Sequence, residues 1–205
     1  AAIHCWNMQS GREEWTHDEE GVAPDFAVSG KWLLYTGVEK GRVQLMARVA
    51  EKGFGAYSIE TKRPYRDYVG AGAVILADTG DDVLFAVNPE KGAPAWKFQT
   101  HDKLVSRALF DGNEIYGVDA GGGLYAISPD GKKNWGVDLD QPCVSSPVLS
   151  GGHVVVASAR GEVFGVKDGK IRWKTKVGGE VEFAPVVAGA ALFVLSNRGD
   201  LSCLD

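Results

Sequence analysis

Residues 84–96 read LFAVNPEKGAPAW, an apolar run followed by a turn rich in Pro and Gly and by a segment that ends in Trp96. Apolar runs of strand length that are bounded by Gly and Pro are typical of β-hairpins. The segment therefore predicts two antiparallel strands joined by a turn. Its copies are residues 3–15 (IHCWNMQSGREEW), 45–57 (LMARVAEKGFGAY), 124–135 (LYAISPDGKKNW) and 163–173 (VFGVKDGKIRW), and residues 201–205 (LSCLD) begin a further copy.

A large aromatic residue closes each full copy at a nearly constant interval. These residues are Trp15, Tyr57, Trp96, Trp135 and Trp173, which lie 38 to 42 residues apart. A period of roughly 40 residues indicates a repeat architecture, in which each supersecondary unit buries its apolar faces against its neighbours. We therefore expect residues 1–205 to form one array rather than several unrelated domains.

Two further strand signals precede the hairpin in each period. The first is a short segment with proline, at Ala23-Pro24, Arg63-Pro64, Ser146-Pro147 and Ala184-Pro185, with Ser106-Arg107 in the remaining period. The second is a mostly β-branched run after a Gly turn, at residues 32–35, 73–76, 114–118, 154–156 and 191–195. No stretch has the period of an amphipathic helix. The sequence thus predicts an all-β chain with four strands a period, which begins in the middle of a period and ends after a third strand.

Composition and charge exclude several classes of function. The net charge is -5 and no long block of like charge is present, which disfavours nucleic-acid binding. No apolar run approaches the about 20 residues of a membrane helix, and the N-terminus lacks the pattern of a signal segment. The acidic loop at residues 17–20 is expected to be solvated.

The three cysteines predict no metal site, because none has a second Cys or a His at ligand spacing. Cys5 and Cys203 occupy one repeat position, where the sister copies carry Ala47, Ala86, Ala126 and Gly165. We interpret both as small buried residues. A disulfide between Cys5 and Cys203 is an alternative hypothesis.

Catalytic motifs are missing from the sequence. The four histidines fall at unrelated repeat positions, and neither a zinc-protease motif, a nucleophile elbow nor a phosphate loop is present. The glycine run at residues 121–123 precedes a strand rather than a helix, so it lacks the helix amides that bind phosphate. No catalytic, cofactor-binding or metal-binding residue is predicted.

One set of charged residues is a candidate for binding. Arg160 and Arg198 each precede the glycine of the turn before a third strand, so the repeat relates them and predicts that they lie on the same face. Together with Arg107 they could form a face of loops that binds a partner or an anion. The alternative is that all three are solvated turn residues.

These residues together carry a resemblance to a known family. The pattern L-[YF]-A-[LVI]-[DNS]-x-x-x-G-x-x-x-W, preceded by a segment with S-x-P or S-S-P, resembles the β-propeller repeat of the PQQ-like, quinoprotein-type family. The resemblance covers the whole chain. Residues 45–57 depart from it, with Arg48 and Val49 in place of an aliphatic and an acidic residue. The resemblance implies a WD40-like ring of four-stranded blades, in which the repeated aromatic residues are docking residues between blades.

The function that the resemblance implies depends on the branch of the family. Its dehydrogenases hold pyrroloquinoline quinone and Ca²⁺, with eight blades and an adjacent pair of cysteines, whereas this sequence has five repeats and no adjacent cysteines. Its non-catalytic, BamB-like branch contains an outer-membrane assembly lipoprotein, and another contains extracytoplasmic sensor domains. We therefore expect a non-enzymatic scaffold without a cofactor, which binds protein partners in the periplasm or outside the cell.

Several alternatives stay open at this point. The chain could be a fragment of a quinoprotein dehydrogenase, or a propeller that binds a small ligand or a glycan. It could also be a segment of a larger propeller. The ring could close within one chain or between chains, because unpaired edge strands invite pairing.

Overall fold

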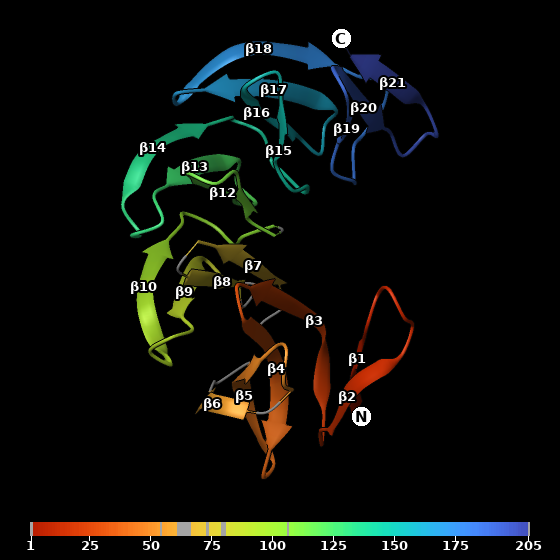
Figure 1. The fold of residues 1–205 in the computed structure, drawn as a ribbon. Coiled ribbons are helices and arrows are strands. Elements are labelled where there is room, and N and C mark those ends of the chain that lie inside the picture. Colours follow the sequence, from red (N-terminus) through yellow and green to blue (C-terminus); the bar gives the residue numbers. More distant parts are fainter. Residues whose placement is uncertain are drawn as a thin grey trace. The chain divides into compact units, whose positions relative to one another are not determined.

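The computed structural model describes residues 2–53, 55–60, 67–72, 74–78, 81–105 and 107–204. Every regular element in these residues is a β-strand, and the strands pair antiparallel. Figure 1 shows them in chain order. The all-β prediction is therefore confirmed. Ser106 and the predicted strand at Arg63-Pro64 lie outside the described residues.

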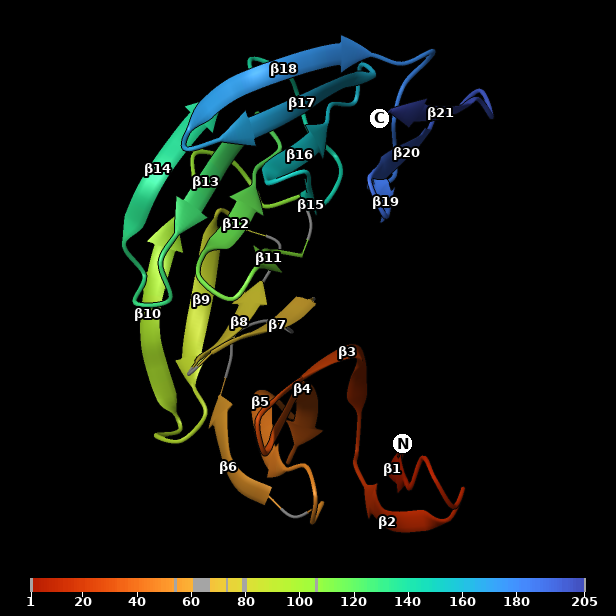
Figure 2. The same cartoon turned by 45° about the horizontal axis from the view of Figure 1, so that its top comes forward.

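Four complete sheets have four strands each, and in each sheet neighbouring strands are consecutive in the chain. The first consists of β3 (Val22–Ser29), β4 (Trp32–Glu39), β5 (Arg42–Val49) and β6 (Gly55–Glu60), and the second of β7 (Asp67–Ala71), β8 (Val74–Asp78), β9 (Val83–Asn88) and β10 (Ala93–Gln99). The third consists of β11 (Leu109–Phe110), β12 (Ile115–Val118), β13 (Gly123–Ile127) and β14 (Lys133–Asp138). The fourth consists of β15 (Val148–Ser150), β16 (His153–Ala157), β17 (Glu162–Lys167) and β18 (Lys170–Lys176). Figure 2 shows the order β15 to β18 clearly.

Two smaller sheets contain the first and last strands. β1 (Ala2–Trp6) pairs with β2 (Glu13–Asp18), and β19 (Val186–Ala188), β20 (Ala191–Leu195) and β21 (Leu201–Leu204) form a three-stranded sheet. In the four-strand repeat, β1 and β2 correspond to the third and fourth strands, whereas β19, β20 and β21 correspond to the first, second and third. This agrees with the strand order that the sequence predicts.

The chain divides into two compact units. Unit 1 comprises Ala1–Thr79 and Phe85–Trp96, and unit 2 comprises Gly80–Leu84 and Lys97–Asp205. In unit 1, Leu34, Leu45 and Val87 belong to one buried apolar cluster. Unit 1 thus has a core of its own.

The core of unit 2 explains why its strands are apolar at consecutive positions. All of β16 after His153 is buried. Val154 and Val156 pack in one cluster with Val118 and Leu124 of the preceding sheet, whereas Val155 packs in another cluster with Leu192 and Val194 of the following sheet. Successive side chains point to opposite faces of a strand, so the sheet β15–β18 is covered on both faces.

Trp15, Tyr57 and Trp135 each lie against a glycine of the next hairpin. A Cβ atom added at Gly53 would lie 2.5 Å from the Trp15 ring, and one at Gly92 would lie 2.9 Å from the Tyr57 ring. In unit 2, a Cβ at Gly169 would lie 3.0 Å from the Trp135 Cβ and 3.4 Å from its ring. The Trp15 indole nitrogen also donates a hydrogen bond to the Ala50 carbonyl, at 3.0 Å. Glycine is needed at Gly53 and Gly92 because a side chain there would occupy the space of the ring. Trp96 and Trp173 are half-buried in β10 and β18.

Tyr57 fills its docking position imperfectly. Its hydroxyl oxygen is buried and has no hydrogen-bond partner among the described residues. Burial, with a smaller contribution from the negative charge of Glu90, raises the pKa of Tyr57 to about 12. An unpaired buried hydroxyl costs about 1–3 kcal/mol. The residue is therefore a weak point of unit 1.

We expect Tyr57→Trp to raise the free energy of unfolding by about 1 kcal/mol more than Tyr57→Phe does, the contribution of one new hydrogen bond. Pro89 holds the position that Ala50 holds in the preceding repeat, so the new indole N–H can donate to the Pro89 carbonyl as Trp15 does to Ala50. Urea denaturation measures the change. Tyr57→Phe, which only removes the hydroxyl, is the control and should give a smaller gain. A loss of stability in the Trp variant would contradict the docking geometry.

Two expectations from the sequence are wrong. Residues 17–20 are not all solvated, because the Glu19 carboxylate is 6% exposed and pairs with Arg48. Cys203 is exposed and Cys5 is half-buried, whereas their counterparts Ala47, Ala86 and Ala126 are buried. The reason is that β1 and β21 each have a single neighbouring strand among the described residues. Whether Cys5 and Cys203 pair stays a prediction.

Candidate functional site

One kind of turn, between the second and third strands of a sheet, positions the candidate binding residues of unit 2. It begins at Asp119, Ser158 and Ser196, whose carbonyls accept hydrogen bonds from Gly122, Gly161 and Gly199. Each of the three residues also pairs with the loop from the preceding fourth strand, in the bridges Leu104–Asp119, Cys143–Ser158 and Val181–Ser196. The turn and the loop therefore meet at the same end of each sheet.

The side chain of the first turn residue fixes the turn. The Ser158 hydroxyl accepts a hydrogen bond from the Glu162 amide at 3.1 Å, and the Ser196 hydroxyl accepts one from the Asp200 amide at 3.2 Å. Both serines are buried. Small polar side chains that bond to nearby amides are what such turns favour. Arg160 lies between Ser158 and Gly161, and Arg198 lies between Ser196 and Gly199, so the turns hold both arginines at the surface.

Arg160 and Arg198 line one pocket of about 810 Å³, together with Lys176, Glu180 and the intervening residues Val177–Gly179 and Asn197. Both arginines and Lys176 are exposed. Glu180 is the only acidic residue in the lining, and its carboxylate accepts a hydrogen bond from the Asn197 amide at 3.1 Å. The pocket therefore has an excess of positive charge. We call it the basic pocket.

Arg107 does not belong to the lining of the basic pocket. It is exposed and precedes β11, two residues before the first strand of its sheet. The structure thus brings together Arg160 and Arg198, which the repeat relates, and adds Lys176, which the sequence did not single out.

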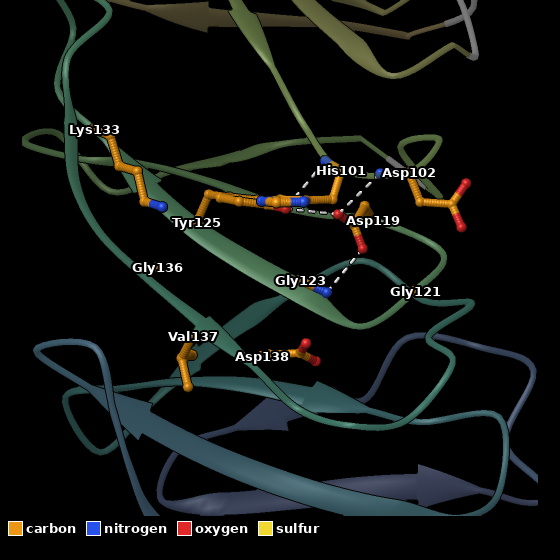
Figure 3. Close-up of a pocket in the computed structure, with 10 residues that line it drawn as sticks. All are labelled: His101, Asp102, Asp119, Gly121, Gly123, Tyr125, Lys133, Gly136, Val137 and Asp138. Carbon is orange, nitrogen blue, oxygen red and sulfur yellow. Dashed lines mark hydrogen bonds between the residues drawn. The ribbon is translucent and has the colours of Figure 1, made fainter.

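A second pocket of about 260 Å³ lies at the turn of Asp119, and Figure 3 shows it. Asp119 is 1% exposed. Its Oδ1 accepts hydrogen bonds from the amides of Gly122 at 3.0 Å and Gly123 at 2.8 Å. Its Oδ2 accepts the Tyr125 hydroxyl at 2.7 Å and the Asp102 amide at 3.3 Å. A buried carboxylate with four donors holds the whole wall of this pocket in place. We call it the Asp119 pocket.

Aromatic and charged side chains surround the Asp119 pocket. The His101 and Tyr125 rings are nearly parallel, with an interplanar angle of 7° and centroids 6.3 Å apart. Burial and the hydrogen bond to Asp119 raise the pKa of Tyr125 to about 12, so the hydroxyl stays a donor. The Lys133 ammonium lies 5.5 Å from the centre of the Tyr125 ring, a cation–π distance.

The Asp119 pocket departs from the repeat at three positions. Asp119 stands where the next two repeats have Ser158 and Ser196, and Gly123 stands where they have Glu162 and Asp200. A Cβ at Gly123 would lie 2.5 Å from the Tyr125 hydroxyl and 2.6 Å from Asp119 Oδ2. The glycine is therefore what permits the bond between these two side chains.

The third departure is Gly136, where the sister strands β10 and β18 carry Lys97 and Lys174. A Cβ there would lie 2.8 Å from the Lys133 side chain. Gly136 thus lets Lys133 reach over Tyr125. Sequence reasoning missed this site, and a comparison of the repeats position by position could have found it.

In the part of the chain that the structure describes, no group of three or more His, Cys, Asp or Glu side chains is arranged to hold a metal ion. The described residues also include no helix with the length and apolarity to cross a membrane.

Four-stranded antiparallel sheets in sequence order, with an aromatic residue of one sheet docked on a glycine of the next, define a β-propeller of the PQQ-like type. A family model described as "Outer membrane protein assembly factor BamB" matches residues 59–146 and again residues 124–205. The chain belongs to this family.

Solved structures agree on the fold. The chain is similar to the crystal structure of BamB from Moraxella catarrhalis, at 16% sequence identity and a TM-score of 0.72 over 94% of this chain. It is also similar to the computationally designed Ika8 protein, at 12% identity and a TM-score of 0.75 over 98% of this chain. A third similar structure is BBS1N in complex with ARL6DN, at 14% identity and a TM-score of 0.65 over 99% of this chain and 71% of that one.

The chain spans 64% of the length of the BamB structure and 64% of the Ika8 structure. No curated protein matches the sequence.

Proposed function

We propose that this chain is a non-enzymatic interaction module of the BamB family, which acts outside the cytoplasm, in the periplasm, and binds a protein partner. The description of the family as an outer membrane protein assembly factor supports this proposal. So does the sequence, which has neither a catalytic motif nor the adjacent cysteines of the quinoprotein dehydrogenases. The partner in this proposal is a component of outer membrane protein assembly.

The basic pocket is the observation that carries the proposal. Two arginines from consecutive turns and Lys176 line this pocket with one acidic residue, Glu180, although the whole chain has a net charge of -5. Among the described residues, neither Arg160 nor Arg198 has a salt-bridge partner. Clustered charges of one sign on a surface steer and orient a partner of opposite charge. The basic pocket therefore fits an acidic segment of a partner.

The test is binding to the purified outer-membrane protein assembly complex, measured by biolayer interferometry at several salt concentrations. We expect the double variant Arg160→Glu, Arg198→Glu to bind about tenfold more weakly, mostly through slower association and with a smaller salt dependence. The matched control is Lys132→Glu, since Lys132 is exposed and paired with Asp130 in a different turn.

Two results would contradict the proposal. Wild-type protein that does not bind the complex would refute the function itself. Equal affinity of the double variant and the wild type would show that the basic pocket does not contact the partner.

The enzymatic alternative can be separated by one assay. Protein incubated with pyrroloquinoline quinone and Ca²⁺ is mixed with alcohols or aldoses and an electron-accepting dye. We expect no dye reduction above that of the free quinone, because no position of this sequence matches a catalytic residue of the quinoprotein dehydrogenases. Dye reduction above this level would overturn the non-enzymatic assignment.

A further inference from the structure

We propose that the Asp119 pocket binds a planar cation, the guanidinium group of an arginine side chain that a protein partner presents. This inference rests on the proposed function and assigns a second contact to the same partner. It is carried by the shape of the pocket, by its charges and by its departure from the sister repeats.

The pocket has a flat aromatic wall. Figure 3 shows the rings of His101 and Tyr125 in line with one another, with Val137 and Asp138 on the other side of Gly123 and Gly136. Tyr125 is buried and held by Asp119, whereas His101 is exposed. A guanidinium is planar and weakly hydrated, so it stacks on aromatic faces at little cost. The volume of about 260 Å³ suits one side-chain head group rather than a large ligand.

The charges favour a cation. Asp102, Asp119 and Asp138 line the pocket, and Lys133 is the only positively charged residue in the lining. Asp102 and Asp138 are exposed, and each accepts a backbone amide with Oδ1, from Lys103 at 2.7 Å and from Asp140 at 2.9 Å. The second oxygen of each has no hydrogen-bond partner among the described residues. Carboxylates that accept N–H donors from a planar fork are the preferred partners of arginine.

The site is specific to one repeat. The positions of Gly123 and Gly136 carry Glu162 and Lys174 in the next repeat, where these two side chains approach to 3.7 Å and pair with each other. In the Asp119 pocket both side chains are missing, and space replaces the ion pair. Positions that packing requires are expected to be alike in every repeat. The changes at Asp119, Gly123 and Gly136 all fall in this one pocket, so they indicate a function of the pocket rather than a requirement of the fold.

The basic pocket and the Asp119 pocket have opposite charges and are built from the same kind of turn and loop in unit 2. A partner with an acidic and a basic contact would bind in one orientation, because the reversed orientation places like charges together. The opposite charges of the two pockets would thus determine the orientation in which the partner binds.

The experiment is a titration of the ¹⁵N-labelled chain followed by NMR, with the amides of Gly122, Gly123 and Gly136 as reporters. The probe is N-acetyl-L-arginine amide, and its neutral counterpart of equal shape is N-acetyl-L-citrulline amide. We expect saturable shifts of the three amides with the arginine probe and none with the citrulline probe. Equal shifts with both probes, or none with the arginine probe, would overturn the proposal.

Variants of the lining residues test whether the Asp119 pocket selects a positive charge. Asp138→Asn should weaken binding of the arginine probe, and Lys133→Gln should tighten it by about two- to fivefold, since it removes the repelling charge. Gly136→Lys, which restores the residue of the sister strands, should abolish binding. Asp130→Asn is the control, because this exposed carboxylate lies in another turn. Weaker binding of the arginine probe in Lys133→Gln would mean that Lys133 supports the probe instead of repelling it, and the proposal would fail.

The proposed function and this inference can fail separately. The variant Arg160→Glu, Arg198→Glu should keep its affinity for the arginine probe, because neither residue lines the Asp119 pocket. If the arginine probe does not bind but the assembly complex does, the Asp119 pocket is wrongly assigned. If the probe binds and the complex does not, the proposed function is wrong.

Discussion

Replacing Glu19 by Ala is expected to destabilise unit 1 by about 3–5 kcal/mol, the usual cost of leaving one charge of a buried ion pair without its partner. Arg48 is 5% exposed. Its guanidinium pairs with the Glu19 carboxylate and also donates to the Tyr35 hydroxyl and to His17. Burial and the hydrogen bond to Glu19 raise the pKa of Tyr35. Removal of Glu19 therefore leaves a buried cation with only neutral acceptors.

A second substitution separates the buried charge from simple loss of packing. The sister repeats carry Val87, Ile127 and Val166 where Arg48 stands, so an apolar residue fits this strand position. We expect Arg48→Ile in the Glu19→Ala background to recover at least about 2 kcal/mol of the loss, since no charge is then left in the core.

Urea denaturation of the wild type, both single variants and the double variant completes a thermodynamic cycle. The free energies should be strongly non-additive. Additive losses would mean that the pair contributes through packing alone, and a Glu19→Ala variant as stable as the wild type would mean that Arg48 reaches solvent when its partner is removed.

Gly161→Ala is expected to destabilise unit 2 by about 3 kcal/mol or more, which places it among the most damaging single substitutions. The residue has a φ of 83°, where a side chain is strained. A Cβ there would also lie 2.0 Å from the Gly179 carbonyl oxygen. Backbone cannot yield as a flexible side chain can, so the turn of Arg160 and the loop that ends at Glu180 must separate.

Gly199→Ala is the matched control. Gly199 holds the same repeat position with a φ of 84°, and no atom lies within 4 Å of its added Cβ. It should cost about 1–2 kcal/mol, the conformational strain alone. The difference between the two variants, measured by thermal and urea denaturation, isolates the steric contact between turn and loop. Equal losses would show that strain explains both and that the contact is loose.

The repeat made most of the fold predictable from the sequence. A hairpin with a glycine turn and a terminal aromatic residue recurs at regular spacing, and strand order within each sheet follows from it. The strand predicted at residues 191–195 is β20, and Pro147 and Pro185 directly precede the edge strands β15 and β19, where a missing N–H is tolerated. Regular patterns are informative because every copy is subject to the same packing.

The individual features were harder to predict because they depend on contacts between loops. Glu19 reads as part of a solvated acidic loop, and only the fold brings it to Arg48, 29 residues later. The lining of the basic pocket was predicted in part, since the repeat relates Arg160 and Arg198 but gives no reason for Lys176 to join them. Asp119 and Gly136 are ordinary residues in isolation and become informative only beside Ser158 and Lys174.

The docking of Trp15, Tyr57 and Trp135 against glycines of the next hairpins has a mechanical consequence. Within a unit, every sheet is held by its neighbours and by few contacts of longer range. A pulling force applied to one end should therefore peel the array one sheet at a time, and each step should release roughly 130 Å of chain for a repeat of about 40 residues. Single-molecule traces would then show a staircase whose regular steps measure the repeat directly.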